Sequence, residues 1–240
     1  MYIIGHNPCM SCIIHNTNKI KAIFIIKDKK EDYLKSISEI SLKNKVNFIN
    51  KSDFLRIHKD IGSNDSIIIE RENFSSSSID ELAPTNKDKS TLIILDQLTD
   101  QNNIGNIFRT AALTNVSGII IPEHSSAGIT TSTASISAGA IELVKFHIAK
   151  NISRTIEILK KKKYWIYSLD MKGKDILDSK FKFDKRSVII LGNEGKGIRK
   201  NILENSDFII SLKQKKIMQL DSFNAANSMA IALYNNYLNN

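Results

Sequence analysis

Residues 90–237 alternate between short apolar runs and amphipathic segments, and this alternation limits the fold more than any other feature. The apolar runs are continuous, as in Val188 to Leu191, and continuous runs are typical of strands buried on both faces of a sheet. The expected strands are 92–95, 118–121, 143–148, 165–169, 188–191 and 208–210, and the expected helices are 103–113, 130–137, 152–159 and 224–234. This order predicts an α/β fold with a doubly wound parallel sheet.

Three polar loops follow predicted strands of this sheet. They cover residues 96–105, 192–197 and 219–224, and each contains Gly or Asn. Ligands of open parallel sheets bind beyond the C-terminal ends of the strands, so we expect a site where these loops meet. The glycines of loop 192–197 expose backbone N–H groups and allow a ligand to approach closely. Taken alone, this loop is also compatible with a plain strand-to-helix turn.

The first 73 residues predict a separate, smaller α/β unit. Strands are expected at 22–26, 46–49 and 66–70, an amphipathic helix at 32–42, and a second helix start capped by Ser52-Asp53. Residues 74–90, which include the run Ser75 to Ser78 and Pro84, have little to bury and indicate a flexible linker. The predicted organisation is a domain over 1–73, a linker over 74–90 and a domain over 91–240.

Basic charge gathers in the C-terminal part of the chain. The 34 Lys and Arg residues against 25 Asp and Glu give a net charge of +9, of which +7 falls in residues 91–240. Clustered lysines near a Gly-rich loop, such as Lys213 to Lys216, suggest a polyanionic partner, most simply nucleic acid. A solvated face is the alternative, and it is the favoured one for Lys160 to Lys163. No segment resembles a membrane span or a leader, so we expect a cytoplasmic protein.

His6, Cys9, Cys12 and His15 recur every three residues, which raises the question of a zinc site. Four ligands from one short turn or helix cannot easily surround an ion, because zinc sites usually combine two separated pairs. We therefore expect no metal. Two cysteines also give no disulfide framework, so both thiols are expected to be reduced and structural.

The stretch from Asp100 to Ala111 begins the first helix of the larger predicted domain. Asn103 and Arg109 are six positions apart; they need not share a helix face, but both can lie near the rim of the strand ends. An arginine at such a rim forms a salt bridge or contacts phosphate, and both roles stay open from the residues alone. The sequence contains no Walker loop and no Ser-His-Asp series.

Three motifs, in this order, resemble the SpoU family of RNA ribose 2′-O-methyltransferases, a family of the SPOUT class. They are Asn-x-Gly-x-x-x-Arg-Thr-Ala from Asn103, Leu-Gly-x-Glu-x-x-Gly from Leu191, and Ser-Phe-Asn-Ala-Ala from Ser222. Residues 2–7 and 22–25 resemble the small L30e-like substrate-binding domain of members that modify a guanosine of large-subunit (23S) ribosomal RNA. The resemblance implies an N-terminal L30e-like domain and a C-terminal SPOUT domain with a deep trefoil knot.

The same resemblance implies the cofactor, the site residues and the partners. The cofactor is S-adenosyl-L-methionine, and the residues implied to bind it are Leu191, Gly192, Asn193, Ile210, Leu212, Leu220 and Phe223. The residues implied as catalytic are Arg109, Asn103, Glu194, Ser222 and Asn224. Because an arginine stays protonated and is a poor base, we expect Arg109 to position the ribose and its phosphate. The implied partners are RNA, most simply ribosomal RNA, and a second copy of the chain whose Arg109 completes the site.

The sequence departs from the family pattern in two places. In the third motif, segment 212–219 lacks the Pro and Gly that are usual in the family, and Phe223 replaces the usual Leu. In the N-terminal domain, Asn64-Asp65-Ser66 stands where His-Gln-Gly often ends the domain. A loop without glycine cannot adopt every glycine conformation, so a reshaped pocket is expected. The alternatives are a catalytically weakened RNA-binding relative, a transfer RNA ribose 2′-O-methyltransferase, and an unrelated nucleotide-binding α/β enzyme.

Overall fold

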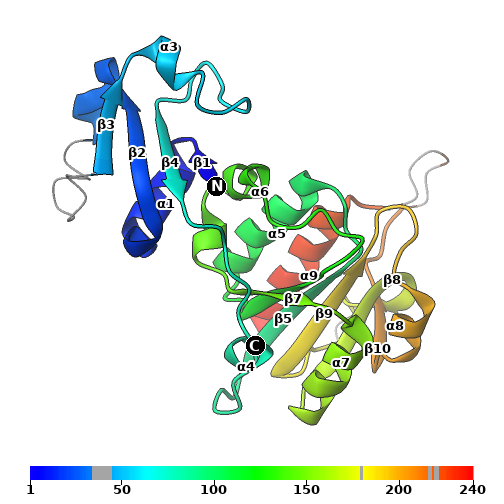
Figure 1. The fold of residues 1–240 in the computed structure, drawn as a ribbon. Helices are drawn as coiled ribbons and strands as arrows, with labels where there is room; N and C mark the ends of the chain where they lie inside the picture. The colour runs from blue at the N-terminus through cyan, green and yellow to red at the C-terminus, as the bar shows by residue number, and fades with distance from the viewer. Residues whose placement is uncertain (34–44, 179–180, 216–217, 219–221, 240) are drawn as a thin grey trace. The chain divides into compact units, whose positions relative to one another are not determined.

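The computed structural model describes residues 1–33, 45–178, 181–215, 218 and 222–239. These residues form two compact units, Met1–Ser75 with Ile129–Leu143, and Ser76–Gly128 with Val144–Asn240 (Figure 1). The predicted helix over 32–42 lies almost entirely outside the described residues. Every helix that the structure describes is too short or too polar to cross a lipid bilayer.

The larger unit is built on a six-stranded sheet. Its elements are α4 (Ile79–Leu82), β5 (Ser90–Asp96), α5 (Gln101–Leu113), β6 (Gly118–Pro122), β7 (Phe146–Ala149), α7 (Ile152–Lys161), β8 (Trp165–Asp175), β9 (Arg186–Gly192), α8 (Lys200–Glu204), β10 (Phe208–Ser211) and α9 (Ala225–Asn239). The strand order is β10-β8-β9-β5-β6-β7, and every neighbouring pair is parallel. The prediction of an α/β fold with a parallel sheet is therefore confirmed. The largest differences from the expected strands are that β7 starts at Phe146 and that β8 continues to Asp175.

Helices cover both faces of this sheet, which explains why its strands are continuously apolar. On β9, Val188 and Ile190 pack with apolar side chains of α7 and α8. Ile189 and Leu191 point to the opposite face, on the side where α5 and α9 lie (Figure 1). All four side chains are buried, and each such burial stabilises the fold by about 1.5–3 kcal/mol.

Strands β5 and β9 are neighbours in the middle of the sheet, and their register determines where a site can form. Asp96 at the end of β5 is paired with Gly192 at the end of β9. From β5 the sheet continues through β6 and β7 on one side, and β8 and β10 lie beyond β9 on the other. The loops that follow β5 and β9 therefore leave the same edge of the sheet side by side, at the switch point where ligands bind in such folds.

The smaller unit has a four-stranded sheet in the order β1-β4-β2-β3. Its elements are β1 (Tyr2–Ile4), α1 (His6–His15), η1 (Thr17–Lys19), β2 (Ile20–Ile26), η2 (Lys27–Lys29), β3 (Val46–Ile49), α3 (Lys51–Phe54), β4 (Ile67–Arg71), α6 (Thr131–Ile136) and η4 (Ala140–Glu142). The predicted helix cap at Ser52-Asp53 is wrong, because α3 starts at Lys51 and its N-cap position is Asn50, which forms no side-chain cap.

The four His and Cys residues of the N-terminal pattern fall on α1. Cys9 and Cys12 are buried, whereas His6 and His15 are exposed. Burial is the main cause that raises the pKa of both thiols, that of Cys12 to about 12. Both thiols are therefore protonated at neutral pH, while the thiolate is the form that binds metal. Within the described residues, no group of three or more His, Cys, Asp or Glu side chains could hold a metal ion.

Part of the expected linker folds with the larger unit. Ser78 and Glu81 form a capping box at the start of α4, the backbone N of Ser77 donates to the carbonyl of Phe146, and Leu82 is fully buried in the core. The contacts divide the chain after Ser75 and group 129–143 with the N-terminal residues. The folding domains 1–73 and 91–240 stay a prediction.

Candidate functional site at the carboxyl ends of the central strands

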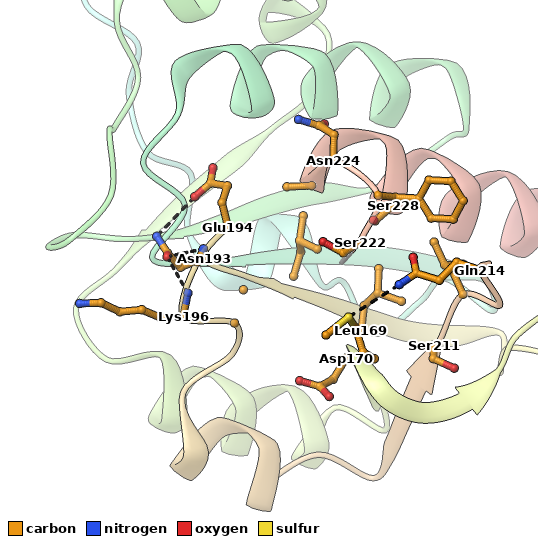
Figure 2. Close-up of a pocket in the computed structure, with 18 of the residues that line it drawn as sticks. Leu169, Asp170, Asn193, Glu194, Lys196, Ser211, Gln214, Ser222, Asn224 and Ser228 are labelled. Atoms are coloured by element: carbon orange, nitrogen blue, oxygen red, sulfur yellow. Dashed lines mark hydrogen bonds between the residues drawn. The ribbon is translucent and has the colours of Figure 1, made fainter. Parts of the chain in front are cut away.

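A pocket of about 480 Å³ opens at the ends of β9 and β10, beside residues 169–172 within β8. Its walls are residues 169–172, 191–197, Ser211, Leu212 and Gln214, and residues 222–225 with Ser228. Asn193 and Glu194 lie at one end, Gln214 and Ser211 at the other, and Ser222 between them (Figure 2). Its volume falls in the range of small-molecule sites, about 300–1,000 Å³.

Loop 192–197 is a tight turn that is stabilised by backbone and side-chain hydrogen bonds of Asn193. The backbones of Asn193 and Gly197 exchange two hydrogen bonds of 3.1 and 2.9 Å. The Asn193 side-chain oxygen accepts from the backbone N of Gly195 at 3.0 Å and of Lys196 at 3.1 Å. A Cβ at position 192 would lie 2.2 Å from the carbonyl carbon of Gly197. Glycine is therefore required at 192 for the turn to close.

An ion pair between a buried carboxylate and a partly exposed arginine anchors the far end of this loop to β5. The Asp96 side chain is fully buried and accepts hydrogen bonds from the backbone N, Nε and Nη2 of Arg199 at 3.1, 2.9 and 2.6 Å. Both oxygens of the carboxylate are used, which compensates for its removal from water. The pair fixes the chain just after Gly197 against the end of the neighbouring strand.

Two side-chain amides connect the loop to the start of α5. The Asn193 side-chain N donates to the carbonyl of Gln97 at 2.9 Å, and that of Asn103 donates to Glu194 Oε1 at 2.9 Å. Asn193 also reaches Glu194 Oε2 at 3.3 Å. The Glu194 carboxylate is thus held at both oxygens, and each oxygen keeps a lone pair that can accept a further hydrogen bond.

These features lie within a segment that matches a known family. The SpoU rRNA methylase family model matches residues 90–234. The chain belongs to the SpoU rRNA methylase family. A Borreliella burgdorferi protein named as an uncharacterized tRNA/rRNA methyltransferase is 38% identical over 148 residues, which are 62% of this chain and 64% of that relative. The matched region is thus less than two thirds of that relative's length.

Solved SpoU structures share the fold over nearly the whole chain. The SpoU methyltransferase AviRb from Streptomyces viridochromogenes, in complex with AdoMet, superposes with a TM-score of 0.81 at 16% identity, over 99% of this chain and 89% of that one. An AdoMet-bound rRNA methyltransferase from Sinorhizobium meliloti gives 0.74 at 18% identity, over 98% and 85%. At these identities the likeness establishes the fold.

Most of the site residues expected from the SpoU motifs come together at the pocket. Its lining includes Leu191, Gly192, Asn193, Glu194, Leu212, Ser222, Phe223 and Asn224. Asn103 joins them through Glu194. The Ile210 side chain is buried and does not line the pocket, and Leu220 lies outside the described residues.

Arg109, which the sequence motifs led us to expect as a catalytic residue, does not line the pocket. It lies on α5 six residues after Asn103, or about 9 Å along the helix axis. Its side chain is exposed, and within the described part of the chain its guanidinium has no hydrogen bond or ion pair. A single copy of the chain therefore does not bring Arg109 into the pocket lining.

One wall of the pocket was missed by sequence analysis. Ile209 of β10 pairs with Ser168 of β8, but the next residue, Ile210, pairs with Lys174. Leu169 still pairs with Leu191 of β9, whereas residues 170–173 form a bulge between the two β10 pairs, and 169–172 reach the pocket. Gly173 permits the close approach, since a Cβ there would lie 2.4 Å from the carbonyl carbon of Ile210. A glycine four residues after the end of the apolar run 165–169 was the available signal.

Proposed function

We propose that this SpoU-family protein transfers a methyl group from S-adenosyl-L-methionine to a ribose 2′-hydroxyl of RNA, most directly of a guanosine in large-subunit ribosomal RNA. The observation that carries the proposal is the pocket beside the end of β9, whose lining includes eight of the residues expected from the family motifs. The likeness of the whole chain to an rRNA methyltransferase supports ribosomal RNA. Transfer RNA is the alternative substrate, because the Borreliella relative is named for both.

The residues of the pocket fit this cofactor. Leu169, Leu191, Leu212 and Phe223 supply apolar surface, and backbone and side-chain polar groups lie at both ends. A nucleoside joined to an amino acid needs both kinds of surface in one cavity. When bound, the cofactor supplies an electrophilic methyl group.

The 2′-hydroxyl is a weak nucleophile, and its proton must leave as the new O–C bond forms. Among the described residues, Asp170 and Glu194 are the carboxylates that line the pocket. Glu194 is held at both oxygens by amides of Asn103 and Asn193, so it is the better oriented acceptor for a hydroxyl hydrogen bond. Arg109, which stays protonated, positions the ribose and its phosphate.

We further propose that the working form is a homodimer in which Arg109 of one copy serves the pocket of the other. The exposed position of Arg109 away from its own pocket supports this arrangement. Large apolar side chains are also exposed on α5 and α9, namely Leu113 (75%), Tyr234 (58%), Tyr237 (53%) and Leu238 (63%). We also propose that the C-terminal part of the chain forms the trefoil knot expected for the family.

The test combines cofactor binding with mapping of the product. S-adenosylmethionine should raise the melting temperature of the purified protein by mass action, with about 2.7 kcal/mol of added stability at a concentration 100 times the Kd. Labelled methyl groups should then enter 23S ribosomal RNA and protect one phosphodiester from alkaline hydrolysis. Labelling of transfer RNA instead would select the alternative substrate, and a methylated base would contradict the ribose assignment.

A second candidate is an RNA-binding relative with weakened catalysis. It is favoured by segment 212–219, which lacks Pro and Gly, and by Phe223, whose side chain is 43% exposed at the pocket. This candidate predicts RNA binding without a melting shift at millimolar S-adenosylmethionine. A clear shift together with methyl transfer would exclude it.

A further inference from the structure

Residues Ile129–Leu143 connect β6 to β7 of the larger sheet, yet they pack with the N-terminal unit. This crossover segment lies inside the range matched by the family model. We propose that it completes the N-terminal unit and that the buried pair Arg71–Glu142 locks it there. The proposal holds whether or not the protein transfers methyl groups.

The crossover segment approaches α1 and β1 closely. Gly139 has a φ of +87°, and a Cβ at this position would lie 2.5 Å from Cβ of Ser11 and 3.0 Å from Cα of Pro8. The Ser11 hydroxyl donates to the carbonyl of Gly139 at 2.9 Å. On the other side, the Ser135 hydroxyl donates to the carbonyl of Ile4 at 3.2 Å. Packing this close is typical of the interior of a single folded unit, so the crossover segment belongs to the same unit as α1 and β1.

The lock is an ion pair that is removed from water. Arg71 Nη1 pairs with Glu142 Oε1, and the side chains are only 4% and 1% exposed. The Asn16 side-chain N donates to the second oxygen of Glu142 at 2.8 Å and to its backbone carbonyl at 3.1 Å. The ring of Phe74 covers the guanidinium, with its centroid 3.9 Å from Cζ. Removal of one partner would leave a buried charge without compensation, which is strongly destabilising.

This arrangement changes how the N-terminal unit is attached. The chain passes between the two units after Ser75, after Gly128 and after Leu143. A cut after Ser75 therefore separates residues 1–75 from the rest of the chain, while residues 129–143 keep both of their covalent connections to the larger unit. Residues 1–75 should then stay bound non-covalently, through their contacts with the crossover segment. A domain that is attached only by a flexible linker would dissociate after the same cut.

The test uses the full chain with a protease site inserted between Ser75 and Ser76, where both residues are exposed. After cleavage under native conditions, gel filtration at micromolar concentration should show residues 1–75 eluting with the rest of the chain. Elution of 1–75 as a separate fragment would overturn the proposal.

The lock itself is tested with four variants of the cleavable chain. Glu142→Gln should weaken retention of residues 1–75 on the order of 10²–10³-fold, because it leaves the Arg71 charge buried and unpaired. Glu72→Gln is the matched control, since it removes a carboxylate of the same unit whose pair with Lys19 is exposed; retention should not change. Equal retention in both variants would show that the Arg71–Glu142 pair is not the lock.

The double variant Arg71→Met/Glu142→Leu keeps the test valid if Glu142→Gln fails to fold. Apolar residues of similar size leave no unpaired charge, so the double variant should retain residues 1–75 better than Glu142→Leu alone. Retention that is worse in the double variant than in the single one would contradict an ion-pair lock.

Discussion

The Gly192–Gly197 loop and the turn of α5 that carries Arg109 belong to the same unit and to neighbouring family motifs, but their surroundings differ completely. The loop is tied to the strand beside it by the Asp96–Arg199 ion pair and by the Asn193 and Asn103 amides. Arg109 is exposed and lies off the pocket. The loop is thus held in place by contacts within its own chain. The Arg109 side chain has no hydrogen bond or ion pair within the described residues, so it is available to contact another molecule. The pocket and the arginine should therefore respond differently to mutation.

The largest effect is expected at Gly192, where the loop has no space for a side chain. Gly192→Val places atoms within about 2.2 Å of the Gly197 backbone, so the turn cannot close and cofactor binding should be abolished. Thermal shift with S-adenosylmethionine measures this. Gly195→Ala is the control in the same loop, because its Cβ would meet nothing nearer than 3.8 Å. A normal shift in the valine variant would disconnect the loop from the cofactor.

Arg109→Ala should lower the rate of methyl transfer by orders of magnitude while the melting temperature and the cofactor Kd stay nearly unchanged. The reason is that the Arg109 side chain is exposed and does not line the cofactor pocket of its own chain. Its planar guanidinium would instead form a bidentate contact with the ribose phosphate. Arg109→Lys should restore little, since one ammonium cannot reproduce that fork. Full activity of the alanine variant would remove Arg109 from the mechanism.

The cross-subunit arrangement can be tested by mixing two inactive chains. Heterodimers of Arg109→Ala and Gly192→Val chains contain one composite site with an intact arginine and an intact loop, so they should regain part of the activity of the native dimer. Each variant alone is the control. Absence of activity in proven heterodimers would rule out a shared site.

Asn103 lies between the two regions, and its replacement should have an intermediate effect. Asn103→Ala removes the 2.9 Å hydrogen bond to Glu194, so kcat should fall about 10–100-fold, which corresponds to about 1–3 kcal/mol for a missing hydrogen bond to a charged group. Cofactor affinity should change little. Asn102→Ala is the control, because the Asn102 side chain is exposed and contacts Asp100. An equal decrease in both variants would argue against a specific role for the Asn103–Glu194 hydrogen bond.

The smallest effect concerns the lysines after β10. Replacing Lys213, Lys215 and Lys216 with Gln should weaken RNA binding for all sequences and flatten its dependence on salt, by about 0.7–0.9 in log–log slope for each phosphate that a lysine no longer neutralises. Lys163→Gln is the control, since this exposed lysine precedes β8 and so lies at the opposite strand ends from the pocket. An unchanged slope in the triple variant would identify the run as a solvated loop.

Local pattern was enough to predict the parallel sheet and most of its elements. Continuous apolar runs and helical spacing reflect burial by near neighbours in the chain, so the strands around Leu92–Leu95 and Val188–Leu191 were found. The motif order was enough to predict the family. Loop 192–197 was also predicted to border a ligand pocket, because its glycines and its place after a strand are visible in the sequence, and it lines the pocket of the structure.

Only the tertiary structure decided which distant residues meet. The hydrogen bond of Asn103 with Glu194 spans 91 positions and that of Arg71 with Glu142 spans 71, and no local pattern specifies either. The bulge of β8 that forms a pocket wall depends on its register with β10. The crossover segment 129–143 reads as part of the larger domain along the chain but packs with the N-terminal unit. Periodicity reports that a side chain will be buried, whereas the partner it meets depends on how the elements pack.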